Sequence, residues 1–160
     1  MTSIIKVDQI QNAAGTAGLT IDSGGRVTLP YQPAFKARKN TSQTTTTNNE
    51  VITFTVETFD QGNNFLNSIF TCPVDGVYFF SCQWLPTNST IQYDVRLLAN
   101  TNTFLSSSRN AQSSGHETVT VNHVGPFTAG DTVKVVASSS GSVVYGDGDN
   151  WSSFMGYLIG

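Results

Sequence analysis

Short apolar segments divided by turn residues occupy most of this chain, and this pattern constrains the fold more than any other feature. Pro, Gly, Asn and Asp gather between the segments, and no segment repeats its apolar residues at the helical period of about 3.6. Successive strands at this spacing are typical of an antiparallel β-sandwich. We expect strands at 34–39, 51–59, 68–71, 76–84, 91–100, 101–107, 117–127, 131–139, 142–146 and 153–159.

Charged side chains are sparse, at 12% of the 160 residues, and the formal net charge is -3. A nucleic-acid-binding protein needs clustered Lys and Arg to neutralise phosphates, so this balance argues against that class. One basic cluster, Lys36, Arg38 and Lys39, lies beside a Thr-rich stretch. We expect it to form a solvated face.

The chain has no apolar run near the roughly 18 residues of a membrane span, so membrane insertion is not expected. Its first residues include Lys6 and Asp8, where a secretory signal would need an unbroken apolar region. We therefore expect no cleaved signal, and release of the protein in the cytoplasm where it is made.

Cys72 and Cys82 are the only cysteines. If 76–84 is one extended strand, their thiols lie too far apart along it for easy bridging, because a disulfide requires Cα atoms within roughly 7 Å. Two cysteines without Cys-x-x-Cys spacing also make a poor zinc site. We interpret both as small buried hydrophobes rather than as a redox pair.

The segment 76–84, GVYFFSCQW, is apolar on both faces of the expected strand. Such a strand is either covered on its outer side or faces a neighbouring subunit, so self-association is plausible. Alternation places Val77, Phe79 and Ser81 on one face and Tyr78, Phe80, Cys82 and Trp84 on the other.

Residues 1–30 form a separate attachment segment in this interpretation, and residues 31–160 form the main domain. The break DSGG, flanked by LTI and RVTL, predicts a hairpin because Gly24 and Gly25 can adopt a positive φ. The segment has too few apolar residues for a core of its own, so we expect it to pair with copies of itself or to dock onto another protein. The apolar residues that would serve as its anchor are Ile4, Ile5, Val7, Ile10, Leu19, Ile21 and Val27.

The stretch FTCPVDGVYFF resembles the core motif of the globular heads of complement C1q. The matching residues are Phe70, Gly76, Tyr78 and Phe80, while Cys82 stands where the family often has another aromatic residue. Other segments resemble the family in the same order along the chain, from about residue 32 to residue 160. They are 33–37, 51–56, 60–65, 94–100, 129–135 and 152–159, the last with Phe154 and Gly156.

This resemblance implies a ten-stranded antiparallel jelly-roll β-sandwich of the C1q/TNF type, assembled as a homotrimer with both chain ends at its base. Animal members are secreted behind a collagen stalk, and this sequence contains no Gly-X-Y repeat.

Residues 4–28 are similar to the starts of bacteriophage fibre and appendage proteins. The shared features are an Ile-Lys-Val-Asp-x-Ile-Gln-Asn opening and a Leu-Thr-Ile-Asp-x-x-Gly-Arg-Val hairpin. The similarity implies a virion protein assembled in the host cytoplasm, whose first 30 residues bind other virion proteins.

Catalytic patterns are missing from the sequence. His116 and His123 are seven residues apart, which puts them on opposite faces of a strand. They therefore cannot bind one metal ion together or act as an acid–base pair. The sequence has no Gly-x-Ser-x-Gly elbow, and DSGGR lacks the spacing and the Lys of a phosphate-binding loop. We expect a protein that is not an enzyme.

The loop YGDGDNW, 145–151, is the candidate ligand-contact loop. Tyr145 and Trp151 are its possible binding aromatics, whereas Trp84 is interpreted as core packing. By family topology the loop lies at the apex of a trimer, where Asp147 and Asp149 of three chains would gather. Their repulsion motivates the hypothesis of a calcium site there, with no other cofactor expected.

The first functional reading is a trimeric tail fibre or appendage whose head binds a glycan or protein on the host surface. Loops around Asn88, at 106–115 and at 145–151 would make the contact, and 40–49 is a further polar loop. Capsid or collar decoration with a stabilising role is the alternative. A secreted cellular C1q-like binding module is the second alternative.

Overall fold

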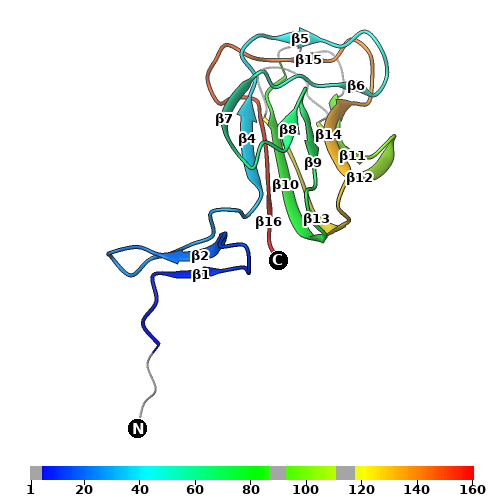
Figure 1. Ribbon diagram of the computed structural model, residues 1–160. Helices are drawn as coiled ribbons and strands as arrows, with labels where there is room; N and C mark the ends of the chain where they lie inside the picture. Colours follow the sequence, from blue (N-terminus) through cyan, green and yellow to red (C-terminus); the bar gives the residue numbers. More distant parts are fainter. Residues whose placement is uncertain (1–4, 87–92, 111–117) are drawn as a thin grey trace. The chain divides into compact units, whose positions relative to one another are not determined.

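The computed structural model describes residues 5–86, 93–110 and 118–160. The chain divides into two compact units, Met1–Gln32 and Pro33–Gly160, and each unit is described by itself. The second unit, which we call the head, contains most of the strands (Figure 1).

The N-terminal unit is a three-stranded antiparallel sheet in the order β1(Gln9–Gln11), β2(Ala17–Ile21), β3(Val27–Thr28). The predicted hairpin joins β2 to β3. The Asp22 side chain accepts hydrogen bonds from the backbone N–H groups of Gly24 and Arg26, both at 2.9 Å. Of the two glycines in the turn, only Gly25 adopts a positive φ, at 78°.

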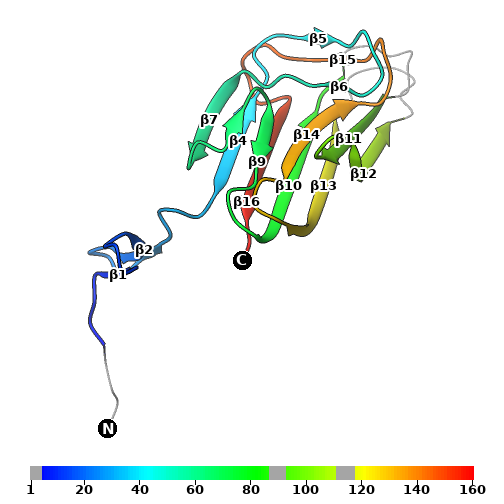
Figure 2. The ribbon, with the colours of Figure 1, turned by 45° about the vertical axis from the view of Figure 1, so that its right-hand side comes forward.

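Two antiparallel sheets form the head. The first has five strands in the order β13(Val119–Phe127), β10(Gly76–Trp84), β16(Ser153–Leu158), β4(Ala34–Arg38), β7(Val56–Gln61). The second has the order β12(Thr103–Asn110), β11(Tyr93–Ala99), β14(Thr132–Ala137), β9(Ile69–Thr71), β8(Phe65–Leu66), and β6(Glu50–Val51) also pairs with β14. The two sheets face each other as the layers of a sandwich (Figure 2).

A short pair of strands, β5(Gln43–Thr44) and β15(Val143–Val144), lies at one end of the sandwich. The C-terminus lies at the opposite end (Figure 1). Among the described residues there is no helix with the length and apolar character needed to cross a membrane.

The core between the sheets is built around stacked aromatic rings. The ring of Phe35 lies between those of Phe65 and Phe70, with centroid distances of 4.6 and 4.7 Å. Phe154 meets Phe35 edge-on at 4.9 Å. Each fully buried ring of this size contributes about 1.5–3 kcal/mol of hydrophobic stabilisation, so this cluster is a large part of the folding free energy.

The predicted alternation in β10 is confirmed. Tyr78, Phe80, Cys82 and Trp84 point into the core and are buried, while the three residues between them are half-buried. The jelly-roll sandwich expected from the sequence is therefore the fold observed.

Three local predictions were wrong. Residues 51–59 are not one strand, because Val51 pairs with β14 in one sheet and Val56 begins β7 in the other. The predicted loop at 106–115 is a continuation of β12 as far as Asn110, and its remaining residues lie outside those described. The predicted loop at 40–49 contains β5, which pairs with β15.

Candidate binding surface

The residues of the C1q-like motif lie together in the two sheets. Phe70 is on β9, Gly76, Tyr78 and Phe80 are on β10, and Phe154 and Gly156 are on β16. Phe70, Tyr78, Phe80 and Phe154 are all fully buried. These buried side chains pack the two sheets together and so fix the positions of the strands whose outer faces form the surface of the head.

Gly156 is required by a close approach between β16 and the aromatic core. It pairs with Phe80 on one side and Phe35 on the other. A Cβ atom at this position would lie 2.7 Å from Cε1 of Phe80 and 2.9 Å from Cε1 of Phe35. Because both rings are buried, no larger residue fits without displacing them.

One half of the five-stranded sheet's outer face, the face turned away from the core, is apolar and exposed. Phe79 pairs with Tyr157 on β16 and with Val124 on β13, and the Phe79 and Tyr157 rings lie 5.4 Å apart. Val124 is 57% exposed, Tyr157 40% and Val77 38%. We call this half the apolar end of the outer face.

The other half of the outer face is polar. Gln83 pairs there with Thr120 and with Ser153, and Ser153 pairs with Arg38. The buried Nη1 atom of Arg38 has no hydrogen-bond partner in the structure. We call this half the polar end.

The predicted ligand-contact loop runs from Tyr145 to Trp151 and leads into β16. The Tyr145 hydroxyl donates a hydrogen bond to Oδ2 of Asp147 at 3.0 Å, which raises the pKa of Tyr145. The backbone N–H of Asp149 donates to Oδ1 of Asp147 at 2.9 Å. Both oxygens of Asp147 are thus used in fixing the loop's own conformation.

Trp151 and its neighbours form an open depression of about 410 Å³. Gln83, Asp149 and Asn150 line it together with the Trp151 ring, which is 49% exposed. The Gln83 side-chain amide donates to the backbone carbonyl of Trp151 at 3.3 Å. Gln83 was missing from the sequence-based site, although its outward position in the β10 alternation could have indicated it.

The base of the loop rests on a buried lysine. Gly146 leaves no room for a side chain, since a Cβ there would lie 2.7 Å from Cγ of Lys39 and 2.8 Å from the carbonyl oxygen of Thr41. Lys39 is 1% exposed, so the predicted solvated face of Lys36, Arg38 and Lys39 is wrong at this residue. Burial lowers the pKa of Lys39 to about 8.

Three oxygen acceptors compensate the burial of Lys39. Its Nζ donates to Oε1 of Gln43 at 2.9 Å, to the carbonyl oxygen of Thr53 at 2.8 Å and to Oγ1 of Thr53 at 3.1 Å. Gln43 in turn donates to Oε1 of Glu50 at 3.1 Å. This network ties the segment between β4 and β5 to the segment between β6 and β7.

The residues considered for catalysis or metal binding are dispersed. Cys72 and Cys82 are free and buried, and desolvation raises the pKa of both thiols. His123 is half-buried on β13, where desolvation lowers its pKa, and His116 lies outside the described residues. In the part of the chain that the structure describes, no three His, Cys, Asp or Glu side chains come close enough to hold a metal. Calcium bound between subunits at Asp147 and Asp149 stays a prediction.

The predicted anchor residues lie in the N-terminal unit, apart from Ile4, which is outside the described residues. Ile5, Val7, Ile10 and Val27 are exposed, by 86%, 41%, 58% and 59% respectively. Leu19 and Ile21 are half-buried. The loop around Asn88 is also outside the described residues, so its predicted contact role is not addressed by the structure.

Comparison with known proteins places the head in a family. The profile of the C1q domain matches residues 34–159. The globular domain of zebrafish complement 1qA is 22% identical, with a TM-score of 0.65 over 80% of this chain and 98% of that one. Murine APRIL is 10% identical, with a TM-score of 0.65 over 80% and 99% of the two chains.

A tumour necrosis factor homologue, Eiger from S. frugiperda, has the same fold at 12% identity, with a TM-score of 0.63 over 81% of this chain and 93% of that one. A search of curated protein sequences found no match. At these identities the solved structures show the shared fold alone, whereas the C1q profile covers most of the chain. The chain therefore belongs to the C1q domain family.

Proposed function

We propose that this protein is a homotrimeric virion attachment protein, whose head binds the host surface and whose N-terminal unit joins it to the particle. C1q/TNF domains are generally non-catalytic binding modules, and proteins of this family typically form homotrimers. The observation that supports the trimer is the exposed apolar end of the outer face.

Trimer formation would remove this apolar end from water. A side chain such as Val or Phe gains about 1.5–3 kcal/mol when it is fully buried, and Val77, Val124 and Tyr157 are each more than a third exposed in the single chain. A contiguous apolar patch on the surface of a soluble protein is characteristic of an interaction site. Three copies would bury it symmetrically.

A matched pair of variants on β13 tests this interface. Val124 and Thr120 are both exposed on the outer face, at its apolar and polar ends respectively. We expect Val124→Asp to yield a monomer in light scattering, because a carboxylate would have to be buried, whereas Thr120→Asp remains trimeric. Trimers of equal stability from both variants would refute this interface.

We propose that the ligand of the head is a glycan bound at Trp151. An exposed indole ring offers an apolar platform for the C–H face of a sugar, and Gln83, Asp149 and Asn150 around it offer hydrogen-bond partners for hydroxyl groups. This combination favours host-surface binding over a purely stabilising role. The depression lies at the polar end, away from the proposed apolar contact between subunits.

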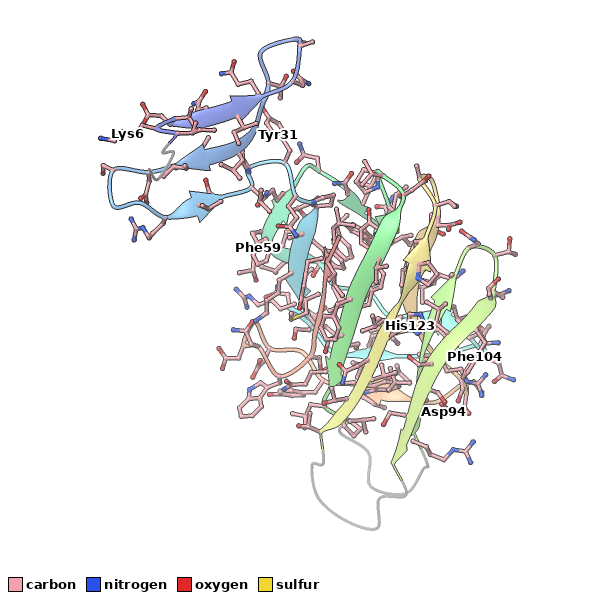
Figure 3. All side chains as sticks on the ribbon, turned by 90° about the horizontal axis from the view of Figure 1, so that it is seen from below. Lys6, Tyr31, Phe59, Asp94, Phe104 and His123 are labelled. Carbon is pink, nitrogen blue, oxygen red and sulfur yellow. The ribbon has the colours of Figure 1, made fainter. Side chains whose placement is uncertain are left out.

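Binding to an array of bacterial surface glycans tests this site. Phe104 provides the control, because it is also an exposed aromatic residue but lies on β12 of the other sheet (Figure 3). We expect Trp151→Ala to weaken binding by about tenfold or more, and Phe104→Ala to bind like the wild type. Equal binding by the two variants, or no glycan bound by the wild type, would reject the glycan assignment.

The virion assignment rests on the similarity of residues 4–28 to the starts of phage fibre proteins. Electron microscopy of purified virions labelled with an antibody against this chain tests it directly. We expect label on a tail fibre or another appendage. Label on the capsid or collar would indicate decoration instead, and unlabelled virions would refute the assignment.

A further inference from the structure

The N-terminal unit is an amphipathic sheet with one apolar face. Ile10 on β1 pairs with Leu19 on β2, and Ile21 on β2 pairs with Val27 on β3. Leu19 and Ile21 are two residues apart, so these four apolar side chains lie on one face. The other face carries Gln9, Thr20 and Thr28, which pair across the same strands.

No described residue of β1, β2 or β3 is buried. Ile10 and Val27 are more than half exposed, and Tyr31, which follows β3, is 68% exposed (Figure 3). Ile10, Leu19 and Tyr31 also border a groove of about 440 Å³. A sheet of three short strands without a covered apolar face is not stable alone, so its fold requires something that covers this face.

We propose that the N-terminal units of three subunits pack their apolar faces against one another and form a shared β core. The apolar face consists of Ile10, Leu19, Ile21 and Val27. Each unit thus has two further copies of itself as its partners. The proposal rests on the homotrimeric head proposed above.

The position of the tether favours copies of the same unit as partners. The N-terminal unit ends at Gln32, and β4 of the head begins two residues later at Ala34. Ala34 pairs with Tyr157 at the apolar end of the outer face, where three heads would meet. Such a short tether holds the three units at an effective concentration in the millimolar range, far above that of a separate protein.

The charges of the unit also permit close packing of copies. Among residues 5–31, Lys6 and Arg26 balance Asp8 and Asp22, so identical units do not repel one another through net charge. Arg26 is already paired with Asp22 at 2.7 Å. None of these four charged residues belongs to the apolar face.

This arrangement leaves Ile5 and Val7 for attachment to the particle. Both precede β1 and are exposed, and neither belongs to the face that the three units would share. Self-assembly of the sheet and anchoring to other virion proteins would therefore use different residues of the same segment.

Hydrogen exchange on the purified full-length chain, with no other protein present, tests the inference. Val27 and Thr28 are neighbours on β3 that point to opposite faces, so Val27→Asp disrupts the apolar face and Thr28→Asp is its matched control. We expect the β2 amides of the wild type and of Thr28→Asp to exchange at least about tenfold more slowly than those of Val27→Asp. Light scattering on the same samples reports whether the heads are trimeric.

The outcomes separate this inference from the proposed function. A trimer with rapidly exchanging β2 amides would overturn the shared core but not the head trimer. The N-terminal unit would then require a different binding partner. Equal protection in Val27→Asp and Thr28→Asp would also overturn it, because the apolar face would then be irrelevant. A monomeric wild-type chain would overturn the proposed trimer and the shared core together.

Discussion

Replacing Gly156 with Ala tests whether the family motif is set by packing in the aromatic core. The added Cβ would lie 2.7 Å from Cε1 of Phe80 and 2.9 Å from Cε1 of Phe35. Carbon atoms in contact normally lie about 3.5–4.0 Å apart, so both rings must move by up to about 1 Å. Phe35 cannot yield easily, because its ring is stacked between Phe65 and Phe70.

Overpacking of a rigid core costs about 1–3 kcal/mol, and the two simultaneous ring contacts put Gly156→Ala at the upper end, about 3 kcal/mol. For a head of this size, each kcal/mol lowers the melting temperature by about 4 °C, so we expect a decrease of about 12 °C.

Gly125→Ala is the matched control for the melting experiment. Gly125 is also a strand residue of the five-stranded sheet, and its added Cβ would lie 2.7 Å from Nε2 of His123. His123 is only half-buried, so its ring can rotate away, and we expect a change of no more than about 1 kcal/mol. The variants are compared at one protein concentration, because subunit association would shift the melting temperature. Equal destabilisation by the two substitutions would refute the packing argument.

Three further predictions concern ionisable groups. Between pH 8 and 10.5, Lys39 is protonated in the unfolded chain but has lost its proton in the folded one. The free energy of unfolding measured in urea should therefore rise with pH in this range, and Lys39→Met should abolish the rise. Hydrogen bonds led by that from the Thr46 N–H lower the pKa of Glu50 to about 2. The stability that Glu50 contributes above pH 4.5 should therefore be lost on acidification toward pH 2, and Glu50→Gln should lessen this loss. Desolvation raises the pKa of Cys72 to about 12, and it also raises the pKa of Cys82, so neither thiol should react with a disulfide reagent at pH 8 until the chain unfolds.

Each of these three has a clear contrary result. If the free energy of unfolding of Lys39→Met rises with pH as in the wild type, a group other than Lys39 causes the rise. Acid unfolding of Glu50→Gln that matches the wild type would show that this carboxylate contributes little. Rapid labelling of a thiol in the folded protein would show that its burial is incomplete.

The sequence alone predicted those features in which the alternation of side chains directly reflects their burial. The alternation in 76–84 predicted the buried and exposed faces of β10, and the spacing of Phe70, Gly76, Tyr78 and Phe80 indicated the fold. The Asp22 hairpin was also predictable, because its turn chemistry is local.

Features that depend on distant contacts could not be predicted. Residues 51–59 are β-branched or aromatic at every position except Glu57, so the sequence reads as one strand and does not reveal that the chain crosses from one sheet to the other within them. The polar residues 106–110 resembled a loop because β12 is an edge strand, and an edge strand tolerates polar residues. Lys39 is buried only because Gln43 and Thr53 supply its acceptors, and neither pairing is visible in the sequence.

The candidate binding surface was predicted only in part. Tyr145 and Trp151 were predicted as the aromatic residues of the contact loop, and Trp151 does lie on the surface. Gln83 is 68 positions away in the sequence and could not be predicted to hydrogen-bond to Trp151. The internal use of both Asp147 oxygens likewise follows from the folded loop rather than from the composition.

The mass of the purified wild-type chain by sedimentation equilibrium tests the central claim most directly. A homotrimer joined through the apolar end of the outer face predicts a mass three times that of the 17.2 kDa chain, with no smaller species at micromolar concentration. A species of 17.2 kDa at that concentration would contradict the account.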